Sequence, residues 1–276
     1  MYLHYTLWQV DVKNPIFCYT EGMNPELQSR INSKGEVRAQ SGGGWVLTLR
    51  SGDDKQYRWA QVDDYIPLPR RNFRWRAPLR FSLRARVSEP SAAGTWGFGL
   101  WNDPFAMNLL GETARRLPAL PNAAWFFYAL PPNYLTLRDE APGHGFLAQV
   151  FRSLRIPSLL LAPGGLALPL LAMRAAGRAF RRAARRMVAE DSARVHVDVT
   201  QWHDYELRWL PGEVRFKVDG SERLVTPLSP RGPLGLVIWI DNQFMSFPPD
   251  GQLRMGLLPV ERDASLEVQD IQIESI

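Results

Sequence analysis

The chain has 276 residues, 45% of them hydrophobic and 22% charged, which is typical of a soluble globular protein with a sizeable core. These proportions exclude disordered, collagen-like and coiled-coil chains. The formal net charge of +5 suggests at first a nucleic-acid or membrane-surface partner.

Few sequence features point to a metal, a cofactor or secretion. The single cysteine, Cys18, excludes an internal disulfide and a Cys-based zinc site. No phosphate-binding glycine loop or Gly-x-Ser-x-Gly motif occurs, and no histidine stands at metal-ligand spacing from a second histidine or acid. We therefore predict no metal and no cofactor. Residues 1–10 lack a secretory signal, so we expect a cytoplasmic protein that is at most peripheral to a membrane.

Alternating apolar and polar residues predict β-strands over most of the chain, because successive side chains on a strand point to opposite faces of the sheet. Early strands are expected at residues 5–12, 37–40, 45–49 and 57–62. In residues 79–87 the odd positions are apolar and the even positions are Arg80, Ser82, Arg84 and Arg86. This pattern predicts a half-buried strand whose arginines face solvent.

Residues 152–194 interrupt the strand pattern. Residues 156–173 carry no charge, but Pro157, Pro163 and Pro169 argue against a membrane-spanning helix. We predict a short apolar helix, a Pro-Gly-Gly break and a longer amphipathic helix over about 169–189. Its apolar face would carry Met173, Ala176, Phe180, Ala184 and Met187, and another face Arg174, Arg178, Arg181 and Arg185. Three roles stay open: a helix packed on the fold, a lid, or an arm on an anionic membrane through residues 156–187.

The C-terminal part again has the strand pattern. Valines at positions 195, 197 and 199 alternate with polar residues, and further strands are predicted around 205–209 and 214–218. Asp219-Gly220 predicts a tight hairpin turn. A phase slip at Gln269-Asp270 predicts a β-bulge in the last strand. The fold class is therefore all-β: an antiparallel jelly-roll β-sandwich, one domain over residues 1–276, with a helical insertion at 152–194.

The insertion accounts for the net positive charge. Residues 152–194 contain nine arginines and two acids, a net charge of +7, so the rest of the chain carries −2. Apart from Phe180, the insertion has no aromatic residue that could stack on bases, and its arginines are not interleaved with polar residues that recognise bases. We therefore predict no nucleic-acid partner.

Three stretches resemble the concanavalin A-like lectin/glucanase superfamily, and family 16 glycoside hydrolases in particular. Residues 202–220, WHDYELRWLPGEVRFKVDG, are similar to a strand pair of that family. Residues 94–101, GTWGFGLW, and 266–273, LEVQDIQI, are similar to its Gly-Thr-Trp strand and its last strand. The resemblance covers the chain from about residue 79 to its end. It implies a two-sheet jelly roll with a concave substrate face.

The chain lacks the catalytic motif of that family. Family 16 enzymes carry Glu-x-Asp-x-(x)-Glu on one strand, which places a nucleophile and a general acid on the same face. The corresponding residues here, 122–130, are NAAWFFYAL and include no carboxylate. The later pair Asp139-Glu140 has the wrong spacing. The resemblance therefore implies the fold and makes the family's hydrolytic mechanism unexpected.

Two aspartates in aromatic surroundings are the catalytic candidates. Asp103 and Asp241 each follow a Trp-containing apolar strand, where a carboxylate needs a partner or a raised pKa. We predict that they form an acid/base or ligand-anchoring pair; the alternative is that each bonds backbone amides at a strand end. The predicted ligand-binding residues are Trp96, Trp101, Asn102, Trp125, Phe127, Trp239, Asn242 and Phe244. Some of these aromatic residues could instead belong to the core.

Two histidines have other predicted roles. His203 lies in the Trp-His-x-Tyr strand, where a hydrogen-bonded structural histidine is predicted. His144 lies in Pro142-Gly-His-Gly145, a loop that could fold over the cleft.

The leading hypothesis is an enzyme or binding protein for a small, partly hydrophobic molecule such as a lipid, terpenoid or glycolipid, held in an aromatic cleft. Whether it is an enzyme stays open; any chemistry would be general acid/base catalysis without a metal. The alternatives are a non-catalytic glycan-binding module, a glycosidase with relocated carboxylates, and a peripheral membrane protein.

Overall fold

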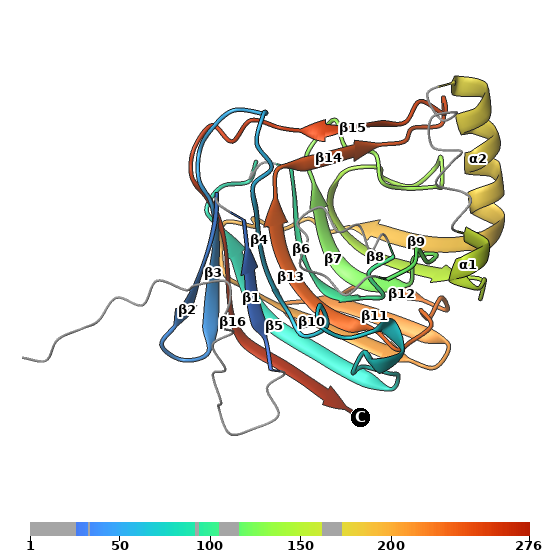
Figure 1. The fold of residues 1–276 in the computed structure, drawn as a ribbon. Coiled ribbons are helices and arrows are strands. Elements are labelled where there is room, and N and C mark those ends of the chain that lie inside the picture. The colour runs from blue at the N-terminus through green and yellow to red at the C-terminus, as the bar shows by residue number, and fades with distance from the viewer. Residues whose placement is uncertain (1–25, 33, 92–93, 105–115, 162–172) are drawn as a thin grey trace, which may run out of the picture.

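The computed structural model describes residues 26–32, 34–91, 94–104, 116–161 and 173–276. They form a sandwich of two antiparallel seven-stranded sheets, which confirms the predicted fold class (Figure 1). The expected strand 5–12 and Cys18 lie outside the described residues.

Sheet A has a strongly curved outer side (Figure 1). Its strands, in spatial order, are β1 (Gln28–Ile31), β4 (Trp59–Asp63), β13 (Gly235–Asp241), β6 (Thr95–Trp101), β7 (Ala123–Ala129), β8 (Gly145–Ser153) and β9 (Val188–Arg194). The strands curve, and α2 (Arg174–Met187) and the hairpin β14–β15 (Gln243–Ser246 and Arg254–Leu257) stand on the concave side (Figure 1). We call this concave side, which faces away from the second sheet, the outer face of sheet A.

Sheet B closes the other side of the core. Its strands, in spatial order, are β12 (Ser221–Thr226), β11 (Glu213–Val218), β10 (His203–Leu210), β5 (Leu79–Val87), β16 (Ala264–Ser275), β3 (Gly44–Leu49) and β2 (Gly35–Gln40). As predicted, β5 alternates buried apolar residues with half-exposed arginines. The arginines pair across the sheet: Arg80 with Glu206 at 2.7 Å and Arg86 with Glu267 at 2.9 Å. These exposed pairs contribute little to stability, so the buried apolar side of the strand holds it in place.

The predicted hairpin and bulge are confirmed. Asp219 and Gly220 have φ of 51° and 74° between β11 and β12, the left-handed conformation that a two-residue turn requires. The pairing of β16 with β5 shifts between Gln269 and Gln272, where Asp270 also has a positive φ of 54°. The phase slip in the sequence therefore reflects an extra residue that bends the last strand.

The strand pattern at 195–199 is misleading. Strand β9 ends at Arg194, and residues 195–199 belong to no strand, although Val195 and Val199 are buried in the core between the sheets. The Val87 N–H donates to the Val199 carbonyl at 2.9 Å. Alternating burial therefore arises here in a connecting segment that does not pair with other strands in a sheet.

The insertion is smaller than predicted and its helix is placed differently. Strand β8 runs to Ser153, and β9 begins at Val188 directly after α2, so two neighbouring strands occupy both ends of the predicted range 152–194. Helix α1 (Ser158–Leu161) follows β8, and α2 ends at Met187 instead of about residue 189. None of the helices in the described part of the chain is long and apolar enough to cross a membrane.

Helix α2 packs only partly through the predicted apolar face: Ala184 is buried and Ala176 and Met187 are partly buried. Its buried residues are Gly177, Arg181 and Ala184, whereas Met173 and Phe180 are about half exposed. A Cβ at Gly177 would lie 1.8 Å from the Gly251 carbonyl oxygen, so the helix backbone sits directly on the loop after β14. Close packing of two backbones, together with a buried arginine, therefore sets the orientation of the helix.

Candidate ligand-binding face

Five aromatic residues cover the middle of the outer face of sheet A. We call them the aromatic face: Trp59, Trp101, Trp125, Phe127 and Trp239. Trp125 lies at their centre, with its ring centroid 5.5 Å from those of Phe127 and Trp239 and 5.9 Å from that of Trp101. Trp59, Trp101 and Trp125 remain partly exposed.

Glycines in the central strand make room for the large rings. Gly97 pairs with Trp239 on one side and Phe127 on the other. A Cβ at Gly97 would lie 2.7 Å from the Trp239 ring and 2.5 Å from the Phe126 carbonyl oxygen. The absence of a side chain at this position therefore lets Trp239 lie flat across β6.

Replacing Gly97 by valine is expected to destabilise the protein by about 2 to 3 kcal/mol, because an overpacked side chain must displace either Trp239 or the backbone of β7. Urea unfolding measures the change. The matched control is Ala39→Val on exposed β2, which should change stability by less than about 0.5 kcal/mol. Equal stabilities of the two variants would contradict the packing described here.

A chain of polar side chains fixes the orientation of Trp125. Its indole N–H donates to Gln149 Oε1 at 3.0 Å, and Gln149 Nε2 donates to Glu190 Oε1 at 3.0 Å. Glu190 Oε2 accepts the Leu137 N–H at 2.8 Å. Burial raises the pKa of Glu190. These contacts join β7, β8 and β9 across the outer face and hold the central ring rigidly.

Asp241 lies at the end of β13 on the same outer face. Its Oδ1 accepts hydrogen bonds from the Thr95 hydroxyl at 2.9 Å and the Gln243 N–H at 3.2 Å, and the Tyr57 hydroxyl is 3.5 Å from Oδ2. The side chain is almost completely buried. Burial outweighs these hydrogen bonds and raises the pKa of Asp241 to about 7. Asp241 can therefore hold or release a proton near neutral pH.

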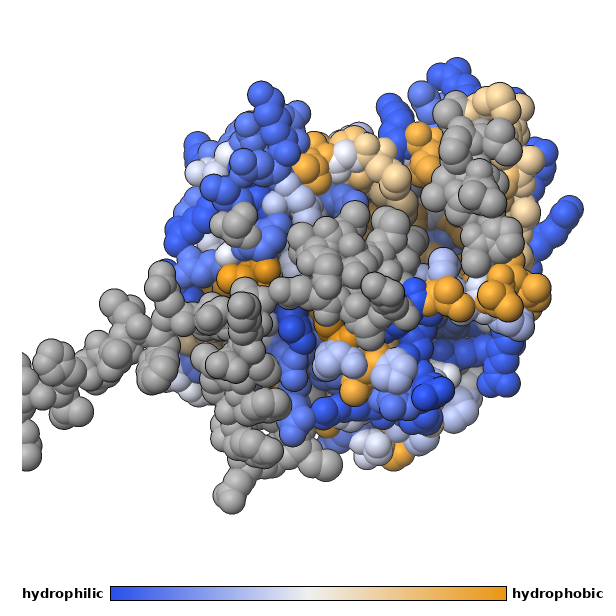
Figure 2. Space-filling model, viewed as in Figure 1, coloured by the Kyte–Doolittle hydropathy of each residue, from blue (hydrophilic) through white to orange (hydrophobic). Residues whose placement is uncertain are grey.

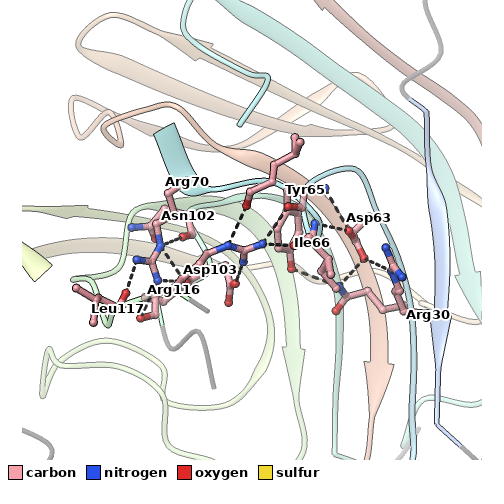
Figure 3. Close-up of polar contacts among 12 residues, drawn as sticks. Arg30, Asp63, Tyr65, Ile66, Arg70, Asn102, Asp103, Arg116 and Leu117 are labelled. Atoms are coloured by element: carbon pink, nitrogen blue, oxygen red, sulfur yellow. Dashed lines mark hydrogen bonds and ion pairs between the residues drawn. The ribbon is translucent and has the colours of Figure 1, made fainter. Parts of the chain in front are cut away.

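Asp103 belongs to a polar network at the opposite end of β6 (Figure 3). Its carboxylate pairs with Arg116, whose guanidinium also donates to the carbonyls of Tyr65, Ile66 and Leu68. Arg70 donates to the Asp103 carbonyl at 2.6 Å. This network ties the loop after β4 to the end of β6, which is a structural role for the carboxylate.

The structure does not bring the two candidate aspartates together. Asp241 is paired with Thr95 at the start of β6, whereas Asp103 follows the end of that strand. Eight residues of extended chain separate the two positions by about 25 Å. The predicted acid/base pair is therefore absent. Each aspartate stands at or just beyond the C-terminal end of its strand, and because the two strands run antiparallel these ends point in opposite directions.

The other carboxylates of this face are also far apart. Asp241 and Glu190 lie on β13 and β9, with three strands between them, which corresponds to about 19 Å across the sheet. Asp63 is four residues along the strand pair from Asp241, or about 13 Å, and accepts the N–H groups of Tyr65 and Ile66. Both separations exceed the roughly 5 to 9.5 Å needed for glycoside hydrolysis.

Several predicted ligand-binding residues have structural roles instead. Trp96 is 1% exposed in the core between the sheets and stacks on Tyr128, so it cannot contact a ligand on the outer face. Asn102 bonds the backbone of Leu120 and Asn122, and buried Asn242 bonds the backbone of Gln56, Arg58 and Leu258. Phe244, partly exposed on β14, contacts Gly256 across the hairpin and lies outside the aromatic face.

The loop between β7 and β8 covers part of the aromatic face. Leu135 packs against the cluster around Trp239, and Leu137 packs against the cluster of Ala123, Phe151 and Val188, which Trp125 also contacts. Arg181 of α2 fixes this loop: its guanidinium donates to the carbonyls of Thr136, Leu137 and Phe247 and pairs with Asp139 at 2.9 Å. The arginine is 3% exposed, in contrast to the predicted solvated position.

His203 is a hydrogen-bonded structural residue, as predicted. Its Nδ1 lies 2.6 Å from Asp219 Oδ2 and its Nε2 lies 3.0 Å from the Asp198 carbonyl. His144 is part of the loop before β8 and is partly exposed. Among the described residues, no group of three His, Cys, Asp or Glu side chains could hold a metal ion.

A shallow depression of about 360 Å³ lies on the outer side of sheet B, where β5, β10, β11 and β16 meet. In its lining, Arg80 and Arg84 pair with acids of the neighbouring strand β10, and Arg208 pairs with Glu206 of its own strand. The depression therefore presents mostly neutralised charge and is a weaker candidate than the aromatic face.

Sequence reasoning missed part of the aromatic face. Trp59, Gln61 and Gln149 lie on it, and Glu190 supports it from the edge strand. The alternation Trp59-Ala-Gln-Val-Asp63 indicates that Trp59 and Gln61 share one face of a strand. It does not indicate whether that face points into the core or away from it. Glu190 was not predicted to lie near this face, because its strand was assigned to the insertion.

No family model matches the chain, and no curated protein matches it in sequence. Solved structures do resemble it. A family 16 endo-glucanase from Bacteroides ovatus is 7% identical with a TM-score of 0.49, over 90% of this chain and 94% of that one. A carbohydrate-binding module, CBM66, from Bacillus subtilis is 9% identical with a TM-score of 0.37, over 90% and 95%. A sialidase is 11% identical with a TM-score of 0.42, and this chain spans 17% of its length. Likenesses of this degree say nothing about what the chain binds.

Proposed function

We propose that this protein is a divergent concanavalin A-like β-sandwich that binds a glycan on its aromatic face without hydrolysing it. The observation that carries the proposal is the exposed side of Trp125, held in a fixed orientation by Gln149 and Glu190 at the centre of four further aromatic residues. Flat rings accept the apolar faces of sugars, and neighbouring amide groups can bond sugar hydroxyls.

The positions of the acids support binding over hydrolysis. Strand β7 carries Trp125 and Phe127 where the resembling hydrolases carry their carboxylates. Asp241 stands about 13 Å from Asp63 along the strand pair and about 19 Å from Glu190 across the sheet. A two-carboxylate mechanism needs a much shorter separation.

Replacing Trp125 by alanine is expected to weaken glycan binding at least about tenfold, because one well-placed aromatic contact contributes roughly 1.4 kcal/mol or more. An oligosaccharide array followed by titration of the bound sugar measures the loss. Trp202→Ala is the matched control, since Trp202 is a partly exposed tryptophan directly before β10, with the Arg86 guanidinium over its ring. Binding that is unchanged in Trp125→Ala, or equally weakened in both variants, would contradict the proposed site.

A second candidate function is acid catalysis by Asp241 on a partly hydrophobic ligand. A buried carboxyl with a pKa of about 7 beside two hydroxyl groups is suited to donating a proton at neutral pH. In that case Asp241→Asn keeps ligand binding and loses turnover, whereas Trp125→Ala loses both. Binding of a fluorescent fatty-acid probe in place of sugars would favour this candidate.

A further inference from the structure

A second surface, unrelated to the aromatic face, lies along α1 and α2. We call it the arginine–leucine edge. Its exposed residues are Leu154, Leu159, Leu160, Arg174, Arg178, Arg182, Arg185 and Arg186. Figure 2 shows hydrophobic atoms around α1 and hydrophilic side chains projecting from α2 along the same side of the molecule.

The positive charge of this edge is only partly neutralised. Helix α2 contains no acidic residue. Arg174 has Asp250 at 3.9 Å, and Arg185 has Asp139 at 2.9 Å. Within the described residues, Arg178, Arg182 and Arg186 form no ion pair and stand four residues apart, in one row along the helix.

The packing of α2 directs this row away from the protein. Gly177, Arg181 and Ala184 form the buried side, and the close backbone contact of Gly177 with Gly251 fixes the rotation of the helix. Arg178, Arg182 and Arg186 lie about a quarter to half a turn from that side. The helix is therefore held along the surface with its cationic row free.

Exposed leucines accompany the arginines. Leu159 is 72% exposed and Leu160 70%, and Leu154 is half exposed. Large aliphatic side chains are not normally left this open in a cluster on a soluble surface. A cationic row beside protruding leucines has the two properties of an interfacial membrane contact: attraction to anionic headgroups and insertion of apolar side chains.

We propose that the arginine–leucine edge docks on anionic lipid surfaces. The arginines lie over the headgroups, and Leu159 and Leu160 enter the boundary between headgroups and acyl chains. A nucleic acid could also attract the arginines, but it offers no environment that favours the exposed leucines over water. The charge and the leucines together therefore favour a membrane.

The test is sedimentation of the full-length protein with vesicles of phosphatidylcholine and phosphatidylserine at 3:1. Arg178→Gln/Arg182→Gln/Arg186→Gln is expected to lower the partition coefficient about 100-fold, because each basic residue near an anionic surface contributes about fivefold. Leu159→Ser/Leu160→Ser should lower it about tenfold or more. Binding should fall on raising the salt from 50 to 500 mM and be weak on pure phosphatidylcholine.

The matched control is Arg71→Gln/Arg76→Gln/Arg262→Gln, which removes the same charge from exposed positions outside α1 and α2. Circular dichroism confirms that each variant is folded. The proposal is overturned if the wild type does not bind the anionic vesicles, or if the control loses as much binding as the α2 variant. Tight binding of a 20-nucleotide single-stranded RNA without vesicle binding would assign the edge to nucleic acid instead.

Discussion

Replacing Arg181 by alanine is expected to destabilise the protein by about 3 kcal/mol. The change leaves the carbonyls of Thr136 and Phe247 without their donor and leaves Arg185 as the remaining partner of the Leu137 carbonyl and of Asp139. Unpaired buried polar groups cost about 1 to 3 kcal/mol each before relaxation, and loss of one member of a buried ion pair costs several. The half-exposed Asp139 and water entering the site reduce the total. Chemical denaturation measures the effect.

The matched control is Arg182→Ala, an exposed neighbour on the same helix, expected to change stability by less than about 0.5 kcal/mol. Hydrogen exchange should show faster exchange in residues 134–139 and in α2 of Arg181→Ala, because Arg181 is the buried one of the two arginines, Arg181 and Arg185, that connect them. Arg181→Lys should recover only part of the stability, since an ammonium group cannot reproduce the guanidinium's forked geometry. Equal stabilities of the two alanine variants would show that the loop is held by other contacts.

Asp241 is expected to make the folded protein less stable as the pH rises from about 4 to about 7. In the unfolded chain an aspartate ionises near pH 3.9, whereas burial raises the pKa of folded Asp241 to about 7. The folded state therefore binds more protons than the unfolded state in this window, and stability falls with pH. The whole pKa difference between the folded and unfolded states corresponds to a change of about 4 kcal/mol in the free energy of unfolding. Asp241→Asn removes this ionisation and keeps acceptors for Thr95 and Gln243.

The measurement is the free energy of unfolding at intervals between pH 4 and 8. Burial also raises the pKa of Asp64, to about 6, and that of Glu190, so the wild-type slope has several sources. The difference between wild type and Asp241→Asn isolates one of them: the variant should gain relative stability as the pH rises. Asp54→Asn, an exposed aspartate, serves as the control. Parallel curves for wild type and Asp241→Asn would exclude a raised pKa at Asp241.

The fold was largely predictable because it depends on local patterns. The alternation in β5, the Asp219-Gly220 turn and the bulge in β16 each follow from side-chain direction or backbone freedom over a few residues. The valines at 195–199 show the limit of this reasoning, because alternating burial does not by itself prove a strand ladder.

The candidate site was predictable only in part. Trp101, Trp125, Phe127 and Trp239 do gather on one face, as the aromatic-rich stretches suggested. Trp96 lies in the same kind of stretch but on the opposite face of β6 from Trp101. A shift of one residue along the strand separates a side chain in the core from one on the outer face, and a strand that is apolar on both sides gives no signal to distinguish them.

By itself, the sequence determined the all-β class, the absence of the hydrolase carboxylates from β7 and the concentration of arginines between β8 and β9. These properties follow from the amino-acid composition and from the order of residues within short stretches of the sequence. The tertiary structure decided which acids meet and which arginine is buried. Asp103 and Asp241 were separated because strands β6 and β13 run antiparallel, which puts their ends on opposite edges of sheet A. Arg181 became an internal link because the backbone contact of Gly177 with Gly251 turned it inward. Both outcomes depend on the direction and packing of segments far apart in the chain, and local patterns do not carry that information.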